Sequence, residues 1–229
     1  MTVRVVDLET TGLDPAQHAI VEIAAVDVLR DGSIANSREA LVCPPHPVPH
    51  AASAVHHLLD EDLAGQPPLR EVIGDFAGAD VYVAHQAAFE RSFLAEHLGE
   101  VTWVCTYKCA LRVYPTLESH GNQFLRYHLG HASPFGLDRH TLVPHRALSD
   151  AIVTAAIFVD LTKAAKWSDL VKWSAEPALH TMLTFGKHRG QRYGAVPEDY
   201  LSWIIAKSDL DESTKFSAAH WLGQRSAAA

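Results

Sequence analysis

Two acidic residues stand two positions apart in a segment that otherwise has the pattern of a buried β-strand. Asp7 and Glu9 lie within residues 3–13, VRVVDLETTGL. Because successive side chains of a strand point to opposite faces, residues two apart share a face, and both carboxylates converge on one spot. Two like charges there require compensation, for which a bound cation is the usual solution. A frayed strand end in water would suit one acid better than two followed by Thr-Thr-Gly, so the segment predicts a metal site.

Length and composition set broad limits on the protein. A chain of 229 residues buries the core of one domain with a smaller addition. It has no apolar run long enough to span a membrane, and its N-terminus lacks the layout of a signal peptide. Cys43, Cys105 and Cys109 have no paired CxxC spacing, which favours buried thiols over disulfides or a zinc site. We therefore expect a cytoplasmic protein that contacts no membrane.

The net charge bears on the class of partner. A formal charge of −8 argues against a protein that coats nucleic acid electrostatically. Acids that share divalent cations would offset part of this charge, so a phosphodiester substrate is still compatible with the sequence. The charge then predicts few and local contacts with such a substrate.

Apolar periodicity divides the first part of the chain into strands and helices. The expected strands cover residues 3–8, 19–29, 33–42, 81–84 and 103–105. The expected helices cover residues 69–77, 88–98, 122–129 and 146–165, and residues 43–50, with four prolines, read as an irregular connection. Three hairpin-like strands followed by alternating strands and helices predict an α/β fold, with a mixed sheet flanked by helices.

Two further acids occupy positions where an apolar helix face is expected. Glu90 falls in the first turn of the helix after His85, and dipole complementation alone explains an acid there. Asp150 lies in the apolar 146–165 segment. His145, five residues earlier, approaches the same centre only from the loop before that helix. That placement gives a mobile imidazole beside a carboxylate, as a general base requires.

In this order and spacing, the chain resembles the DEDD superfamily of 3′→5′ exonucleases, in its histidine-containing (DEDDh) branch. The resemblance spans residues 1–166 and implies an RNase H-like exonuclease domain. Exonuclease X is the most similar branch, because its relatives share a segment like 103–106 and an appendage like 183–190. We expect residues 167–178 to be a linker and 179–229 a small α+β module. The matching motifs are Asp7-x-Glu9-Thr10-Thr11-Gly12, His85 to Glu90 and His145-x4-Asp150.

The resemblance implies an activity and a set of site residues. Asp7, Glu9, Glu90 and Asp150 would bind two Mg²⁺ ions, for which Mn²⁺ can substitute. His145 would act as the general base, and Asp7, Glu9 and Asp150 would be catalytic with it. The implied reaction is hydrolysis from the 3′ end of single-stranded or duplex DNA, which releases nucleoside 5′-monophosphates and serves DNA repair.

Two positions depart from the family pattern. The family has Asp where this chain has Glu90, and Asn where it has Gln86. Each replacement adds one methylene, and Mg²⁺ tolerates little distortion of its octahedral shell. The change implies a shifted or water-bridged carboxylate, a preference for Mn²⁺, or a slower site.

Substrate contacts are expected at two places. Near the acids, the resemblance implicates Thr10, Gln86 and Leu13, whose side chain either stacks on the terminal base or packs under its own loop. In the module, Lys187 and Arg189 lie in an expected hairpin turn, followed by a helix near residues 197–203. This turn either contacts a phosphate backbone or is a solvated hairpin tip.

Other functions stay open at this point. The chain could be a proofreading subunit of a DNA polymerase or a ribonuclease like RNase T. It could also be a docking module for repair or replication proteins, with its catalysis weakened by Glu90. A proofreading subunit would need a polymerase-binding tail, whereas the end of this chain has the pattern of a small folded module.

Overall fold

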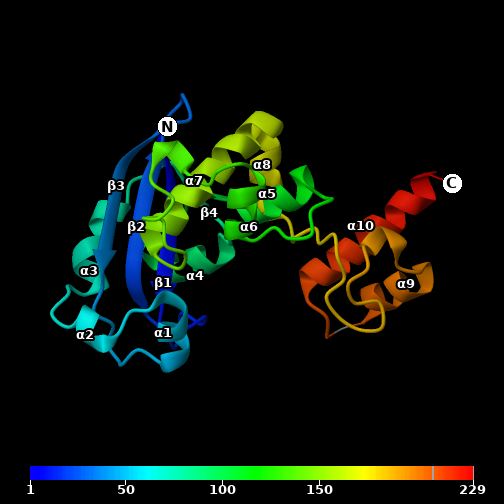
Figure 1. The fold of residues 1–229 in the computed structure, drawn as a ribbon. Helices are drawn as coiled ribbons and strands as arrows, with labels where there is room; N and C mark the ends of the chain where they lie inside the picture. Colours follow the sequence, from blue (N-terminus) through cyan, green and yellow to red (C-terminus); the bar gives the residue numbers. More distant parts are fainter. Residues whose placement is uncertain (208, 229) are drawn as a thin grey trace.

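The computed structural model describes residues 1–207 and 209–228, which form a five-stranded sheet flanked by helices, with a helical module beside it (Figure 1). The strands are β1 (Val3–Thr10), β2 (Ile20–Val28), β3 (Ile34–Leu41), β4 (Val81–Ala84) and β5 (Thr102–Cys105). Their order is β3-β2-β1-β4-β5, with β2 antiparallel to both neighbours and β4 parallel to both of its own. The predicted mixed sheet is confirmed.

The helices cover both faces of this sheet. Towards the N-terminus they are α1 (His50–His56), α2 (Asp60–Leu63), α3 (Leu69–Val72), the 3-10 turn η1 (Ile73–Phe76) and α4 (Ala88–Leu98). Then follow α5 (Thr106–Val113), α6 (Asn122–His128), the 3-10 turn η2 (Pro134–Gly136), α7 (Ala147–Ala164) and α8 (Trp167–Ala175). The module holds the 3-10 turn η3 (Tyr193–Ala195), α9 (Glu198–Ala206) and α10 (Glu212–Ala228). None of these helices has the length and apolar character needed to cross a bilayer.

Successive side chains of β1 point to opposite faces of the sheet and so contribute to two layers of the core. Val5 packs in the cluster that includes residues of α5, α6, α7 and α8, whereas Leu8 packs in the opposite cluster with residues of η1 and α4. By the same alternation, Asp7 and Glu9 lie on the face of Val5, beneath α7. The strand therefore places both acids on the face that α7 covers.

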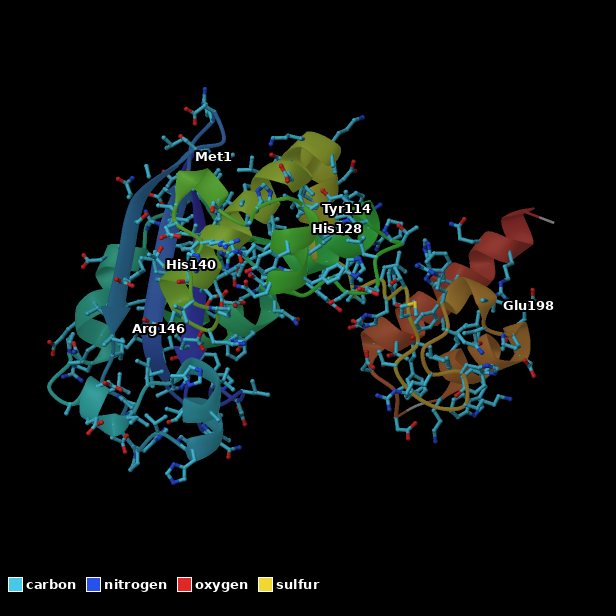
Figure 2. The ribbon with its side chains drawn as sticks, viewed as in Figure 1. Met1, Tyr114, His128, His140, Arg146 and Glu198 are labelled. Atoms are coloured by element: carbon cyan, nitrogen blue, oxygen red, sulfur yellow. The ribbon has the colours of Figure 1, made fainter. Side chains whose placement is uncertain are left out.

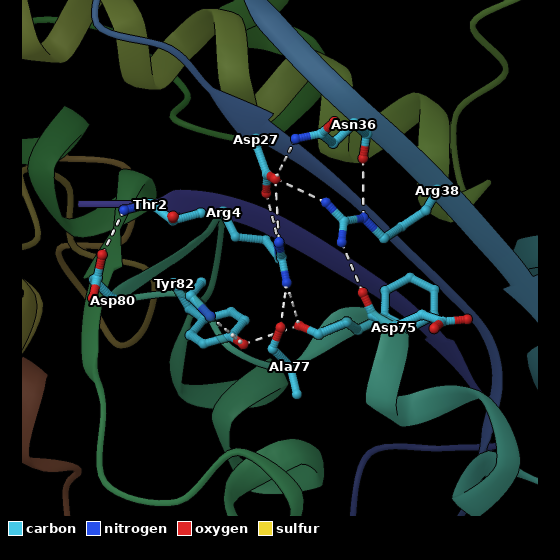
Figure 3. Close-up of polar contacts among 11 residues, drawn as sticks. Thr2, Arg4, Asp27, Asn36, Arg38, Asp75, Ala77, Asp80 and Tyr82 are labelled. Atoms are coloured by element: carbon cyan, nitrogen blue, oxygen red, sulfur yellow. Dashed lines mark hydrogen bonds and ion pairs between the residues drawn. The ribbon is translucent and has the colours of Figure 1, made fainter.

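A buried ion pair ties the strands to the end of η1. The Arg4 guanidinium donates to Oδ1 of Asp27 at 2.7 Å and to the carbonyl of Ala77 at 2.6 Å (Figure 3). Asn36 and Arg38 donate to the other oxygen of Asp27, at 3.0 and 2.8 Å. Burial alone would raise the pKa of Asp27, but these hydrogen bonds and charges outweigh it and hold the pKa below its ordinary value.

The structure differs from the expected linker. Within residues 167–178, the segment Trp167–Ala175 is helix α8 and packs against β5 and α5. Leu170 is fully buried in the core, and the Ser174 hydroxyl accepts a 2.8 Å hydrogen bond from the backbone of Cys105. The mixed polar composition concealed this helix, because only one narrow face of it is buried.

Another difference lies in residues 69–77, expected as one helix. The segment divides into α3 and η1, and Gly74 lies inside η1. Glycine weakens a helix interior through its backbone freedom, which is consistent with the break.

The C-terminal module has its own small core. Its buried residues include Leu183, Tyr193, Leu201 and Ala218, which pack α9 and α10 together. The predicted turn is present, because Met182 and Arg192 form an antiparallel bridge. The predicted helix near 197–203 is present as α9.

Candidate active site

Acidic side chains from three elements line one cavity at the carboxyl end of β1. The pairing of β1 with β2 shifts register between Glu9 and Thr10, so the strand bends where the acids end. The cavity has a volume of about 410 Å³. Its lining includes Asp7 of β1, Glu90 of α4 and Asp150 of α7, together with Leu13, His85, Gln86, Phe89 and Asn122.

Glu9 and His145 complete the group. One ligand atom each from Glu9, His145 and Asp150 lie within 4.8 Å of one another. His145 is exposed on the loop before α7, with a positive φ of 59°. The structure thus brings together all four predicted metal-binding acids and the predicted base.

Glu9, Glu90 and Asp150 are buried and Asp7 is half-buried, without enough positive charge to balance them. Burial raises the pKa of Glu9 to about 8 and that of Glu90 to about 7. Burial also raises the pKa of Asp7 well above its ordinary value, with repulsion from Asp150 and Glu90 adding to it, and it raises the pKa of Asp150. Without a cation, the cluster therefore holds protons near neutral pH.

The Glu90 carboxylate gives a direct indication of a missing partner. Its Oε2 atom is buried and has no hydrogen-bond partner among the residues that the structure describes. A buried carboxylate oxygen without a donor is costly unless a cation or water occupies the space beside it. Three carboxylates line the cavity and a fourth, that of Glu9, lies close to Asp150, and hard divalent cations prefer such a donor set.

Asp150 is held in place by two hydrogen bonds. Its Oδ2 accepts from the backbone N–H of His145 at 2.7 Å, and its Oδ1 accepts from the side-chain amide of Gln123 at 2.6 Å. The fully buried guanidinium of Arg126 donates in turn to Oε1 of Gln123 and to the carbonyl of Leu142. Arg126 thereby fixes the orientation of the Gln123 amide and braces the loop that ends at His145.

A buried glutamate on β2 anchors the same loop from the other side. Glu22 accepts hydrogen bonds from the Arg146 guanidinium, the shortest at 2.7 Å, and from the backbone N–H of Ala147 at 2.9 Å. Glu22 lies opposite Glu9 in the β1–β2 register. Figure 2 shows Arg146 where the loop meets α7. Sequence reasoning missed Glu22, although a charge inside the apolar 19–29 segment was a usable signal.

His85 supports the cavity and stays neutral. Its Nε2 donates to the carbonyl of His120 at 2.9 Å, and its Nδ1 lies 2.9 Å from the Thr106 hydroxyl. Burial lowers the pKa of His85 to about 4. A neutral ring held at both nitrogens suits a structural role, so His145 is the better candidate for the base.

The predicted substrate residues fall in different places. Leu13 is 82% exposed at the cavity and Gln86 is exposed at its edge, so both are free to contact a ligand. Thr10 is buried, and its hydroxyl donates to the carbonyl of Gly12 at 2.7 Å, which holds the turn. Lys187 and Arg189 lie in the module, outside the residues that line this cavity.

Comparisons with known proteins agree with this arrangement. A family model described as Exonuclease matches residues 5–158. The chain is 36% identical over 226 residues to Exodeoxyribonuclease 10 of Escherichia coli K12, which covers 96% of this chain and 98% of that protein. It is 34% identical over 165 residues to DNA polymerase III subunit epsilon of Treponema pallidum, covering 68% of this chain and 74% of that protein.

Solved structures of exonucleases also align with this chain. Exonuclease X in complex with 5′ overhanging duplex DNA aligns with a TM-score of 0.63 and 34% identity, over 76% of this chain and 99% of that one. Escherichia coli Exonuclease I in complex with a dA16 oligonucleotide aligns with a TM-score of 0.58 over 75% of this chain and 42% of that one. At 12% identity, this second match supports the fold alone.

Proposed function

The chain belongs to the exonuclease family that matches residues 5–158, and we propose that it hydrolyses DNA from the 3′ end, releasing nucleoside 5′-monophosphates. The observation that supports this most strongly is the cluster of Asp7, Glu90 and Asp150 around one cavity, with Glu9 and an exposed His145 close to Asp150. The proposal includes DNA repair as the biological setting.

The cluster fits divalent cations. The pKa of Glu9 is raised to about 8 and Glu90 has an oxygen without a partner, so a cation would relieve both the repulsion and the unmet bonding. We assign Asp7, Glu9, Glu90 and Asp150 to hold two Mg²⁺ ions, with Mn²⁺ able to substitute. When bound, the ions supply charge stabilisation for the attacking and departing oxygens.

The residues of the chain perform the remaining steps. His145 accepts the proton of the attacking water, for which its exposed place on the loop gives access. Asp150 and Glu22 fix that loop through the His145 backbone, the Arg146 guanidinium and the Ala147 backbone. Leu13 contacts the face of the terminal base, and Gln86 contacts the strand at the edge of the cavity.

Two observations favour DNA and an independent enzyme. A relative that covers 96% of this chain is an exodeoxyribonuclease, and a solved structure with 34% identity contains DNA. Exodeoxyribonuclease 10 is matched over 98% of its own length, whereas the PolC-type DNA polymerase III of Thermotoga maritima, which covers 91% of this chain, is matched over only 17% of its own. A competition between substrates tests whether the protein prefers DNA to RNA.

In that experiment, 5′-labelled DNA and RNA strands of one sequence are offered together with Mg²⁺. DNA should shorten stepwise at a higher kcat/KM than RNA, and the released products should be nucleoside 5′-monophosphates. Faster loss of RNA would replace the proposal with a ribonuclease.

A further inference from the structure

The turn of the C-terminal module is rigidly held. Its two sides are joined by hydrogen bonds from Leu183 N to Gln191 O at 2.8 Å and from Gly190 N to Leu183 O at 2.7 Å. Gly186 has a φ of +65°, and a side chain there would collide with the Tyr200 hydroxyl. The turn therefore needs glycine in order to lie directly against α9.

Aromatic rings and cations meet where this turn contacts α9. The centres of the His188 and Tyr200 rings lie 4.7 Å apart, and the Trp203 ring lies 5.1 Å from that of Tyr200, tilted by 33°. Lys187 places its Nζ 5.2 Å from the centre of the Tyr200 ring. Trp203 is 46% exposed, and Lys187 and Arg189 are both exposed. We call these five residues, Lys187, His188, Arg189, Tyr200 and Trp203, the aromatic–basic surface.

The turn of this surface is positively charged, whereas α9 begins with the exposed acids Glu198 and Asp199. Residues 178–196 contain Lys187, Arg189 and Arg192 but no acid, although the whole chain has a net charge of −8. Within residues 1–207 and 209–228, neither Lys187 nor Arg189 forms an ion pair. Both charges are therefore free to meet a phosphate.

The turn is also tied to the catalytic domain. Arg192 donates to the carbonyls of Pro115 and Thr116, at 3.0 and 2.5 Å. Tyr114, which precedes these residues, lies on the side of the catalytic domain that faces the module (Figure 2). The same loop continues to Asn122, which lines the catalytic cavity.

A second cavity lies between the catalytic domain and the module. It has a volume of about 440 Å³, and its lining includes Gln86 and Lys108 from the catalytic domain and His180 from the module, together with the acids Glu176, Asp211 and Glu212. Gln86 lines both this cavity and the catalytic one. A strand that leaves the catalytic cavity past Gln86 thus enters the space beside the module.

We propose that the aromatic–basic surface binds the 5′-ward part of the single strand whose 3′ end occupies the catalytic site. The proposal rests on the proposed function for the identity of the strand. Aromatic faces stack on any unpaired base, and the lysine and arginine contact phosphates, so the site holds single strands with little sequence preference. A duplex offers few free base faces, and so it binds this surface less well.

Binding of single-stranded DNA, measured by fluorescence anisotropy without divalent ions, tests this surface directly. For a strand of about 20 nucleotides, Trp203→Ala should weaken binding about tenfold through lost stacking, without changing the salt dependence. Lys187→Ala should weaken binding and reduce the slope of log K against log salt by about 0.7, the value for one phosphate contact on a single strand. Lys166→Ala and Trp167→Ala, exposed residues at the start of α8, are the matched controls and should change neither quantity.

Cleavage kinetics separate this proposal from the proposed function. With Mg²⁺, the double variant Lys187→Ala/Trp203→Ala should raise KM about tenfold on the long strand, leave kcat unchanged, and cleave a trinucleotide as the parent does. Equal effects on the long strand and the trinucleotide, or unchanged binding of the long strand, would overturn the proposal. The latter result would indicate that the surface serves a protein partner. Absence of cleavage at every strand length would refute the proposed function. The anisotropy measurement would still show whether the aromatic–basic surface binds single-stranded DNA.

Discussion

The backbone N–H of His145 donates a 2.7 Å hydrogen bond to Oδ2 of Asp150. One carboxylate therefore both belongs to the acidic cluster and holds the loop that presents the imidazole. The left-handed backbone of His145, with φ 59°, is uncommon for a residue other than glycine, and this bond helps to maintain it. The five-residue spacing of His145 and Asp150 follows from this contact between the loop and the first turn of α7.

Replacing the imidazole should separate base catalysis from metal binding. His145→Ala should lower kcat by about 10²–10⁴-fold, because the attacking water loses its proton acceptor. Any increase of the parent rate with pH that stems from this general base should vanish in the variant. Stabilisation by Mg²⁺ in a thermal melt should persist, because the carboxylates are intact.

His140→Ala is the control, since His140 is also exposed and lies on the same loop. It should keep both the rate and its pH dependence. If His145→Ala instead abolished stabilisation by Mg²⁺, the side chain would be a metal ligand rather than a base.

The Glu22–Arg146 ion pair should act on turnover from outside the cavity. Glu22→Gln keeps the shape of the side chain but weakens its hydrogen bonds with Arg146 and Ala147, so the loop before α7 is less firmly fixed. We expect kcat to fall about 10–100-fold with KM little changed, a magnitude typical of residues that orient active-site groups. Steady-state kinetics on a short DNA strand measures both parameters.

Glu71→Gln, at an exposed position of α3, should leave kcat unchanged. A rise in KM alone in Glu22→Gln would show that the ion pair affects substrate binding and not the catalytic loop.

The acidic cluster should make stability depend on pH when cations are absent. The pKa values of Glu9 and Glu90, about 8 and about 7, lie above their ordinary value of 4.5. The folded protein then binds more protons than the unfolded chain between pH 4.5 and 8, so the free energy of unfolding falls as pH rises through this range. The loss should be on the order of a few kcal/mol, measured by denaturant unfolding in EDTA.

Mg²⁺ should restore stability above pH 7, where the carboxylates lose their protons and bind the ions. Glu9→Gln should stabilise the metal-free protein at pH 8.5 and reduce its response to Mg²⁺. Unfolding free energies that are independent of pH and of Mg²⁺ would contradict a cation-binding cluster.

Shortening Glu90 tests whether the longer side chain is a defect or an accommodation. Gln86 in the same turn also exceeds the residue usual in the family by one methylene, so we expect the helix start to have adjusted to both. Glu90→Asp should then lower the rate in Mg²⁺ and in Mn²⁺, because the carboxylate is pulled away from the ions. The double variant Gln86→Asn/Glu90→Asp should be no better than either single change.

Rates of the parent and the three variants in each metal provide the measurement. A double variant clearly faster than the parent in Mg²⁺ would mean that the longer side chains impair the site.

Several strands, helices and site residues can be predicted from the sequence because the patterns that indicate them are local. The strand β4 and the helix α4 match the predicted ranges 81–84 and 88–98, since apolar periodicity and flanking turns define them. Asp7, Glu9 and Asp150 are recognisable because each interrupts an apolar pattern, whereas Glu90 is identified only through the family resemblance. The structure places the four acids together.

Other features depend on contacts that no local pattern reveals. The hold of Glu22 on Arg146 joins residues 124 positions apart. Gln123 is a polar residue in a short helix until α7 brings Asp150 to it. The helix α8 buries Leu170 in a core built by other segments, so its own composition resembles a linker. Tertiary packing decides these roles, and periodicity describes only single elements.

The most direct test of the catalytic cluster uses one DNA strand labelled at its 5′ end and, in a parallel reaction, at its 3′ end. With Mg²⁺, the parent protein should shorten the 5′-labelled strand one nucleotide at a time and release the 3′ label as a mononucleotide at once. With EDTA, or in Asp7→Ala or Asp150→Ala with an unchanged circular dichroism spectrum, neither label should move. Near-normal cleavage by either variant, or early release of the 5′ label, would contradict a 3′→5′ exonuclease that acts through these carboxylates.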